Sequence, residues 1–162
     1  MITLYHSSPN KITELSKDHE PFNGVLFFSD EPYVMSTSKV TYIYSIDIEE
    51  SEIIEVISLD CDETVHEIIH LASWLLNITI DEDRAHNILT AHESIFDVLS
   101  DMGQHNHFES ASDFDWTVQT LQVKAGENMG YSMVLGDDEQ GAVWYMNMIG
   151  KEDQLNLFDE WN

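Results

Sequence analysis

The sequence predicts an α+β fold in which strands near both ends of the chain flank a helical middle. Apolar or alternating segments typical of strands occur at residues 2–6, 25–28, 40–48, 53–57, 131–135 and 142–148. From residue 61 onward, the apolar residues of the middle recur at helical spacing. With 162 residues and 43% apolar content, the chain is long enough for one domain with its own core. We therefore expect a single domain over residues 1–162, with a helical insert at about 61–112.

The N-terminal part is expected to contain strands separated by turns and one short helix. The first strand ends at His6, directly before a Ser-Ser-Pro-Asn turn. The Val-Leu-Phe-Phe run at 25–28 is typical of a buried strand. Ser29 or Asp30 can cap a helix at about 33–38, because a proline follows in a position that suits the first helical turn.

The remaining elements follow from apolar spacing. The last helix is expected to bury Trp116, Leu121 and Ala125 on one face. The acidic tail after Gly150 carries several apolar residues, so we expect it to dock on the domain. The helices are expected at about 62–76, 81–92, 95–99 and 114–128.

The charge of the chain limits its partners. It has 31 acidic residues against 6 lysines and arginines, a formal charge of −25. Nucleic acids and anionic membranes would repel such a protein, whereas a basic protein surface would attract it. The single cysteine, Cys61, suits a reducing compartment, and no apolar run approaches the length of a membrane span. We expect a cytoplasmic protein with a basic protein partner and no direct contact with nucleic acid or membrane.

A glycine-bounded turn near the C-terminus collects three adjacent acids, Asp137, Asp138 and Glu139. An apolar, aromatic strand follows it. Adjacent carboxylates repel one another, so a purely structural turn has little reason to collect them. Two interpretations stay open. One acid can grip a ligand hydroxyl or stabilise developing positive charge, or the turn is a solvated hairpin in a chain that is acidic throughout.

A second motif lies on the first predicted helix. His66-Glu67-Ile68-Ile69-His70 matches H-E-x-x-H, in which the two histidines share a helix face and can bind zinc, with Glu67 as general base. A zinc-dependent hydrolase is therefore one alternative function. In a chain with eight histidines, so short a motif also arises by chance. The apolar stripe of this helix faces the core and leaves His66 and His70 at its edge, so we assign no metal site.

Another constellation is spread across the chain. It comprises the first-strand segment Leu4-Tyr5-His6-Ser7-Ser8, the aromatic segment Val25–Asp30 with Ser36 on the helix after it, and the Asp137-Asp138-Glu139 turn. These segments resemble, in the same order, three elements of the diphtheria-toxin-like and PARP-like ADP-ribosyltransferases.

The chain is similar in particular to the small anti-CRISPR ADP-ribosyltransferase family that inactivates type I-F effector complexes. The segments Met129–Val134 and Asp138–Gly141 follow the end of that family's pattern. The likeness covers roughly residues 2–48 and 113–150. It implies a split, mostly antiparallel sheet with a helical insert, and NAD as co-substrate.

The resemblance also implies roles for individual residues. His6 would bind a ribose of NAD, and the backbone of Ser7 would hold the nicotinamide amide. An acid, Asp138 or Glu139, would stabilise the positive charge that grows on the ribose as nicotinamide leaves. One aromatic ring, from Phe27, Phe28 or Tyr33, would stack on the nicotinamide ring. The anionic diphosphate of NAD needs hydrogen-bond donors, and the candidates are backbone amides, Ser29, Ser36 or Lys39.

Two residues depart from the family pattern. Ser7 stands where a glycine is usual, so its side chain can narrow the nicotinamide pocket, and Phe27 stands where a tyrosine is usual. The resemblance implies a mono-ADP-ribosyltransferase of the bacterial host cytoplasm that modifies the DNA-recognising (PAM-recognising) subunit of a type I CRISPR effector complex. A non-enzymatic acidic mimic of DNA is the other alternative.

Overall fold

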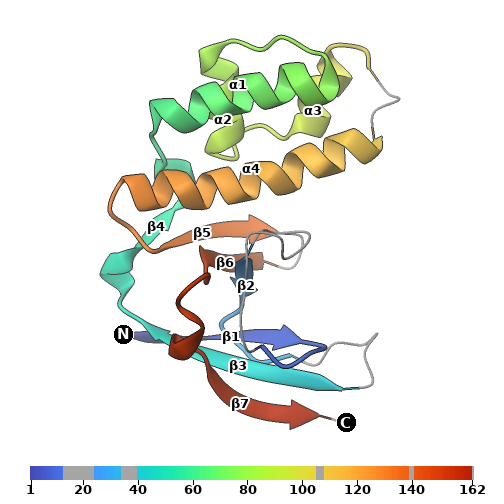
Figure 1. Cartoon of the computed structure of the whole chain (residues 1–162). Coiled ribbons are helices and arrows are strands. Elements are labelled where there is room, and N and C mark those ends of the chain that lie inside the picture. The colour runs from blue at the N-terminus through green and yellow to red at the C-terminus, as the bar shows by residue number, and fades with distance from the viewer. Residues whose placement is uncertain (13–23, 34–39, 105–107, 139–140, 162) are drawn as a thin grey trace.

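The structure is a computed structural model that describes residues 1–12, 24–33, 40–104, 108–138 and 141–161 (Figure 1). It has three layers. Figure 1 shows a layer of helices above a sheet that contains β2, β4, β5 and β6, with the strands β1, β3 and β7 below. The α+β class and the split sheet predicted from the sequence are confirmed.

The helical layer contains all four helices of the described chain. Two of them have side-chain caps at their start: Asp81 caps α2, and Ser94 and Asp97 form a reciprocal capping box at α3. The longest helix, α4, lies across the neighbouring sheet (Figure 1). The bounds are α1 Asp62–Leu76, α2 Glu82–Leu89, α3 Ile95–Asp101 and α4 Phe108–Asn128.

The middle layer is a four-stranded sheet in the order β2-β6-β5-β4. β2 and β6 are antiparallel, as are β5 and β6, whereas β4 and β5 are parallel. The sheet therefore joins a strand from the start of the chain to strands that come after all four helices. The bounds are β2 Val25–Phe28, β4 Ile53–Glu55, β5 Met133–Asp138 and β6 Gly141–Asn147.

The lower layer is an antiparallel three-stranded sheet in the order β1-β3-β7. Its strands are β1 Ile2–Ser8, β3 Thr41–Ile48 and β7 Asn156–Trp161. One β-bridge joins the two sheets, in which Tyr5 and Ser29 exchange both backbone hydrogen bonds at 2.8 Å. This bridge brings the middle of β1 to the residue that follows β2. The first strand was expected to end at His6, but pairing with β3 continues it to Ser8.

Two apolar cores separate the three layers. The larger core lies between the helices and the four-stranded sheet, where Ile68, Leu89 and Phe114 are almost fully buried. The smaller core lies between the two sheets and contains Leu4, Phe28, Ile46 and Met146, among others. Side chains alternate across β2 and β6, so the four-stranded sheet contributes to both cores.

Several predicted boundaries are wrong. β5 continues through Asp137 and Asp138, so these two acids lie in a strand rather than in the expected turn. The last helix begins at Phe108 rather than near residue 114, because Ala111 gives it a further buried position. Trp116 is 41% exposed and not buried, whereas Leu121 and Ala125 are buried as expected.

The strand expected at 53–57 ends at Glu55, and a short 3-10 helix, Val56–Ser58, follows it. The acidic tail does dock, as strand β7 on β3. The short helix expected at 33–38 falls almost entirely outside the described residues. A search of the described helices finds none that is long and apolar enough to cross a membrane.

Candidate functional site

Segments of four strands come together at one place, which we call the strand-end site. Both β2 and β5 run antiparallel to β6: Phe28 at the end of β2 pairs with Trp144, and Asp138 at the end of β5 pairs with Gly141 at the start of β6. The Tyr5–Ser29 bridge adds the middle of β1. The fold thus brings together segments that are far apart in the sequence.

His6 joins the two sheets at this site. Its Nδ1 lies 2.7 Å from the backbone oxygen of Phe27, a distance at which Nδ1–H donates a hydrogen bond to that carbonyl. In the neutral ring, Nε2 is then the nitrogen that carries a lone pair. The ring also lies 5.8 Å from the ring of Phe28, centroid to centroid, which fixes its orientation.

Ser7 fixes the segment that follows β2. Its side chain is buried, and its hydroxyl donates a short hydrogen bond to the backbone oxygen of Tyr33. A glycine, which is usual at this position in the family pattern, could not make this side-chain bond to the backbone of Tyr33. The side chain of Tyr33 itself is exposed.

The three candidate aromatic residues have different surroundings. Phe28 is buried in the core between the sheets, so it supports His6 rather than facing solvent. Phe27 is only half-buried and points to the other face of β2, where its ring lies 5.5 Å from the ring of Tyr145. Of these three aromatic residues, Phe28 is thus buried, Phe27 half-buried and Tyr33 exposed.

The polar groups of Ser29 are occupied within the protein. Its hydroxyl donates to the backbone oxygen of Glu31 at 2.7 Å, and its amide and carbonyl form the bridge to Tyr5. Ser29 therefore shapes the loop after β2. Ser36, Lys39 and Glu139, which the sequence also suggested, lie outside the described residues.

An open pocket of about 350 Å³ lies at the strand ends. Phe27, Phe28 and Tyr33 supply its aromatic surface, and Asp30 and Glu31 supply carboxylates. Its remaining lining residues are Ser29, Pro32, Ala142 and Val143. The start of β6 thus forms one wall, and the backbone of Asp138 is paired with Gly141 directly beside it. We call this cavity the strand-end pocket.

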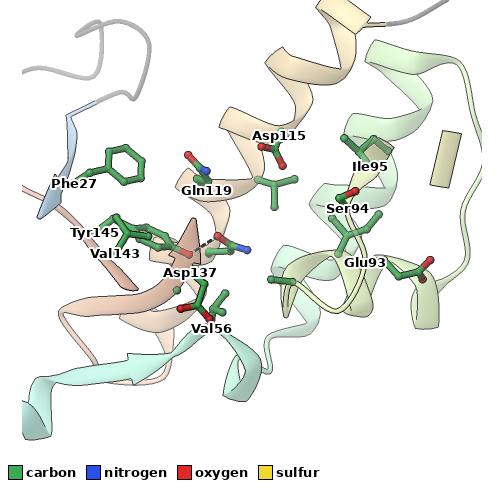
Figure 2. Close-up of a pocket in the computed structure, with 15 residues that line it drawn as sticks. Phe27, Val56, Glu93, Ser94, Ile95, Asp115, Gln119, Asp137, Val143 and Tyr145 are labelled. Atoms are coloured by element: carbon green, nitrogen blue, oxygen red, sulfur yellow. Dashed lines mark hydrogen bonds between the residues drawn. The ribbon is translucent and has the colours of Figure 1, made fainter. Parts of the chain in front are cut away.

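A second pocket, of about 250 Å³, lies on the helical side of the same sheet. Figure 2 shows the α4 side chains Asp115 and Gln119 between the sheet and the segment that carries Ser94. Phe27 and Val143 line both pockets. Phe27 therefore stands at the boundary between the strand-end site and the helical layer.

A buried polar chain forms the floor of the second pocket. The Tyr145 hydroxyl donates to Gln122 Oε1 at 2.6 Å (Figure 2). Gln122 Nε2 in turn donates to the backbone oxygen of Leu89 at 3.0 Å. Burial and, to a lesser extent, the charge of Asp115 raise the pKa of Tyr145, so its phenol stays protonated and donates. Burial likewise raises the pKa of Asp115.

The H-E-x-x-H residues lie on α1, in the helical layer rather than at the strand ends. His66 and His70 are exposed, and His66 Nε2 lies 3.2 Å from Glu82 Oε1. Glu67 is ion-paired with Lys124 at 2.6 Å. Within the described ranges, no group of three or more histidine, cysteine, aspartate or glutamate residues is arranged to hold a metal ion.

Sequence reasoning missed the residues of the second pocket. Asp115 and Gln119 sit at helical spacing on α4, but both are common surface residues on a helix, and no local motif marks them. Gln122 is the one residue here that the sequence could have indicated. It is a polar residue between the apolar residues Leu121 and Val123, and a buried polar side chain requires a hydrogen-bond partner. That partner, Tyr145, is distant in the sequence.

Comparison with known proteins gives two findings. The sequence pattern of the family described as anti-CRISPR type I-F ADP-ribosyltransferase AcrIF11 matches residues 2–152 of this chain. One solved structure, described as the crystal structure of an anti-CRISPR protein, aligns with a TM-score of 0.50 and 18% identity, covering 90% of this chain and 88% of that chain. At this identity the likeness concerns the fold. No curated protein sequence matches the chain.

Proposed function

This chain belongs to the anti-CRISPR type I-F ADP-ribosyltransferase family, and from that premise we propose that it transfers ADP-ribose from NAD to a subunit of a type I CRISPR effector complex. The observation that carries the proposal is the meeting of β1, β2 and β5 at the strand-end site. His6, Phe27 and Asp138 come from the three segments that resemble the family's motifs, and the register and the Tyr5–Ser29 bridge hold these segments together.

The strand-end pocket fits NAD in its aromatic and polar groups. Phe27 and Tyr33 offer two aromatic surfaces for a planar ring. His6 is not among the lining residues; it lies next to the Tyr5–Ser29 bridge, and the Phe27 carbonyl sets the tautomer of its ring. Asp30 and Glu31 line the same pocket and would repel a diphosphate. We therefore place the diphosphate away from these two acids.

In this arrangement each candidate residue of the strand-end site has a proposed role in binding NAD. His6 accepts a hydrogen bond from a ribose hydroxyl. Ser7 contributes its backbone to the nicotinamide amide, and its hydroxyl positions the Tyr33 segment. Either Phe27 or Tyr33 stacks on the nicotinamide ring. Phe28 and Ser29 position His6 and the loop after β2.

The proposed chemical role falls to an acid at the end of β5. NAD supplies an activated C–N glycosidic bond, which breaks with positive charge developing on the ribose carbon. A carboxylate beside that carbon binds the transition state more strongly than the ground state. We assign this role to Asp138, which ends β5 beside the strand-end pocket, with Glu139 as the alternative.

The proposed target is a basic surface of the effector complex that normally holds DNA, in the subunit that recognises the PAM. A protein with a formal charge of −25 is attracted to such a surface and repelled by free DNA. The acidic DNA mimic remains a second candidate, since the same charge supports it. The two differ in one respect: only the transferase requires NAD.

Intact-mass spectrometry of a purified type I-F effector complex tests the proposal. We expect an ADP-ribose increment on one subunit after incubation with this protein and NAD, and none without NAD. His6→Ala is expected to reduce the modified fraction strongly, while His66→Ala on α1, a matched histidine, leaves it unchanged. Inhibition of the complex with no increment, whether or not NAD is present, would instead establish the mimic.

A further inference from the structure

The last strand, β7, presents large apolar side chains to solvent. All six of its side chains are exposed, although Leu157, Phe158 and Trp161 are large and apolar. Trp161 is 52% exposed and Phe158 is 53% exposed. Neither core includes them as buried members. Phe158 packs edge-to-face on Tyr5, with the ring centroids 5.0 Å apart, yet about half of its surface stays exposed. Packing among the described residues therefore accounts only in part for these three apolar side chains.

β7 and the loop after β2 together line an open groove of about 250 Å³, which we call the β7 groove. Its lining residues are Pro32, Tyr33, Ile43, Phe158, Asp159 and Trp161. Three of these are aromatic, and Asp159 is the single charged residue among them. The groove thus combines aromatic surfaces with one carboxylate. This combination suits an arginine or lysine side chain, whose methylene groups pack on aromatic rings and whose charged end pairs with a carboxylate.

We propose that the β7 groove is the docking site for the acceptor protein, and that it receives an arginine or lysine side chain from a basic surface of that protein. This inference rests on the transferase function proposed above. The methylene groups of the incoming side chain lie against Phe158 and Trp161, and its charged end meets Asp159. Tryptophan and tyrosine are the residues that most often carry the binding energy of protein interfaces.

Charge and backbone geometry favour this occupant over two others. A second copy of the chain also carries a charge of −25, so two copies repel each other. An added β-strand is disfavoured because the β3–β7 pairing contains a register shift at Ile43 and Tyr44, and such irregularities protect sheet edges. The Asp159 carboxylate also accepts a hydrogen bond from the amide of Glu160, at 2.8 Å.

The position of the groove links docking to chemistry. Pro32 and Tyr33 line both the β7 groove and the strand-end pocket. The Ser7 hydroxyl binds the backbone of Tyr33 and so fixes the wall between the two cavities. A protein held in the β7 groove therefore presents its neighbouring residues to the strand-end pocket. The family match ends at residue 152, so β7 lies beyond the part of the chain that resembles the family pattern.

The test separates docking from NAD chemistry by measuring two reactions. The first is cleavage of NAD with water as acceptor, which needs no partner. The second is transfer to the purified type I-F effector complex. Phe158→Ala and Trp161→Ala are expected to leave the first reaction unchanged and to raise the KM for the effector complex at least about tenfold, with kcat retained. Trp74→Ala on α1 is the matched control, because Trp74 is 82% exposed and lies in the helical layer.

A charge variant tests the carboxylate. Asp159→Asn keeps an acceptor for the Glu160 amide but removes the charge, so we expect weaker binding of the effector complex and a shallower dependence of binding on salt. Glu127→Gln makes the same change in charge at an exposed position on α4 and is expected to leave binding unaltered. Equal affinities of the two variants would contradict the role of Asp159.

The outcomes distinguish the two proposals. Unchanged transfer by Phe158→Ala and Trp161→Ala, with NAD cleavage intact, would overturn the docking site and leave the transferase function standing. A wild-type protein that binds the effector complex through the β7 groove but does not cleave NAD would overturn the transferase function. A dimer that becomes a monomer on Trp161→Ala, seen by sedimentation, would show that a second copy fills the groove.

Discussion

The helical layer and the strand-end site use their polar side chains in different ways. In the helical layer charges pair with charges: Arg84 contacts both Glu93 and Asp101, and Lys124 contacts both Glu63 and Glu67. At the strand-end site, side chains donate to backbone carbonyl groups. His6 binds the carbonyl of Phe27 and Ser7 that of Tyr33, both in another segment, whereas Ser29 binds that of Glu31 in its own loop.

This difference affects how well a sequence motif can detect each region. Paired charges on a helix place acids and histidines at regular spacing, and regular spacing is what a sequence motif detects. H-E-x-x-H on α1 lies on such a surface, where Glu67 pairs with Lys124 and His66 with Glu82. Side chains that bind the backbone of another segment show no such regular spacing, because the two bonded residues are distant in the sequence.

The largest expected effect concerns stability in the helical layer. Phe114 is completely buried on α4, so Phe114→Ala is expected to lower the free energy of unfolding by about 3–5 kcal/mol. Trp116→Ala, two residues away but 41% exposed, should cost less than about 1 kcal/mol. Urea unfolding followed by circular dichroism measures both. Equal losses would mean that α4 does not pack as the structure shows.

The next effect concerns activity at the strand-end site. If the proposed role of Asp138 holds, Asp138→Asn reduces the rate of ADP-ribose transfer by about 100-fold or more, because it removes the charge proposed to stabilise the transition state. Asp137→Asn, the adjacent acid in β5, is the control. A loss confined to Asp137→Asn would move the catalytic role to that residue, and retention by both would move it to Glu139.

A third variant probes the boundary between the two regions. Tyr145→Phe removes the donor to Gln122 and leaves a buried amide oxygen without it, so it should cost about 1–3 kcal/mol of stability. Thermal unfolding measures this cost. Tyr131→Phe is the control, because Tyr131 is only partly buried. A strong loss of transferase activity by folded Tyr145→Phe would show that the polar chain also shapes the strand-end pocket.

A pH-dependent effect is expected at Asp115. Burial raises its pKa in the folded state, so the folded protein binds this proton more tightly than the unfolded chain does. Ionisation therefore costs stability as pH rises from below the unfolded pKa through the folded pKa. Asp115→Asn should be more stable than the wild type near pH 7, by under about 1 kcal/mol because the carboxyl keeps partial contact with water.

Melting curves at several pH values test this sign. The advantage of Asp115→Asn should disappear under acidic conditions in which the carboxyl is protonated in both states. An advantage for the wild type near neutral pH would instead mean that a cation or donor binds the Asp115 carboxylate.

The smallest expected effect is at the H-E-x-x-H motif on α1. Glu67→Gln weakens one largely exposed ion pair with Lys124 and should change stability by less than about 0.5 kcal/mol. Transferase activity should be unchanged, both in this variant and after treatment of the wild type with a zinc chelator. Loss of activity in both experiments would restore the zinc site as a functional element.

The sequence was sufficient for the fold class, because apolar spacing distinguishes strands from helices over long segments. It was insufficient at element ends. Asp137 and Asp138 were expected in a turn on account of their charge, but pairing with Ala142 and Gly141 keeps them in β5. Tertiary pairing overrode the local preference of aspartate for turns.

For the candidate site, the sequence identified the segments but not their contacts. It suggested Phe27, Phe28 and Tyr33 as equals, and only burial separates them, since Phe28 lies in the core between the sheets. It also suggested Ser29 as a ligand donor, whereas the bridge to Tyr5 and the bond to Glu31 show a structural task. Such distinctions depend on which face of a strand is covered, which a single sequence does not state.

The strand order β2-β6-β5-β4 has a consequence for how the chain folds during synthesis. β2 leaves the ribosome early, but its partner β6 follows only after the whole helical region, so β2 stays unpaired within its sheet for most of translation. The helices, whose contacts are more local, are expected to form first. The chain should therefore acquire its strand-end site as the last step of folding, and pulse-labelled hydrogen exchange should show β2 and β6 protected together and late.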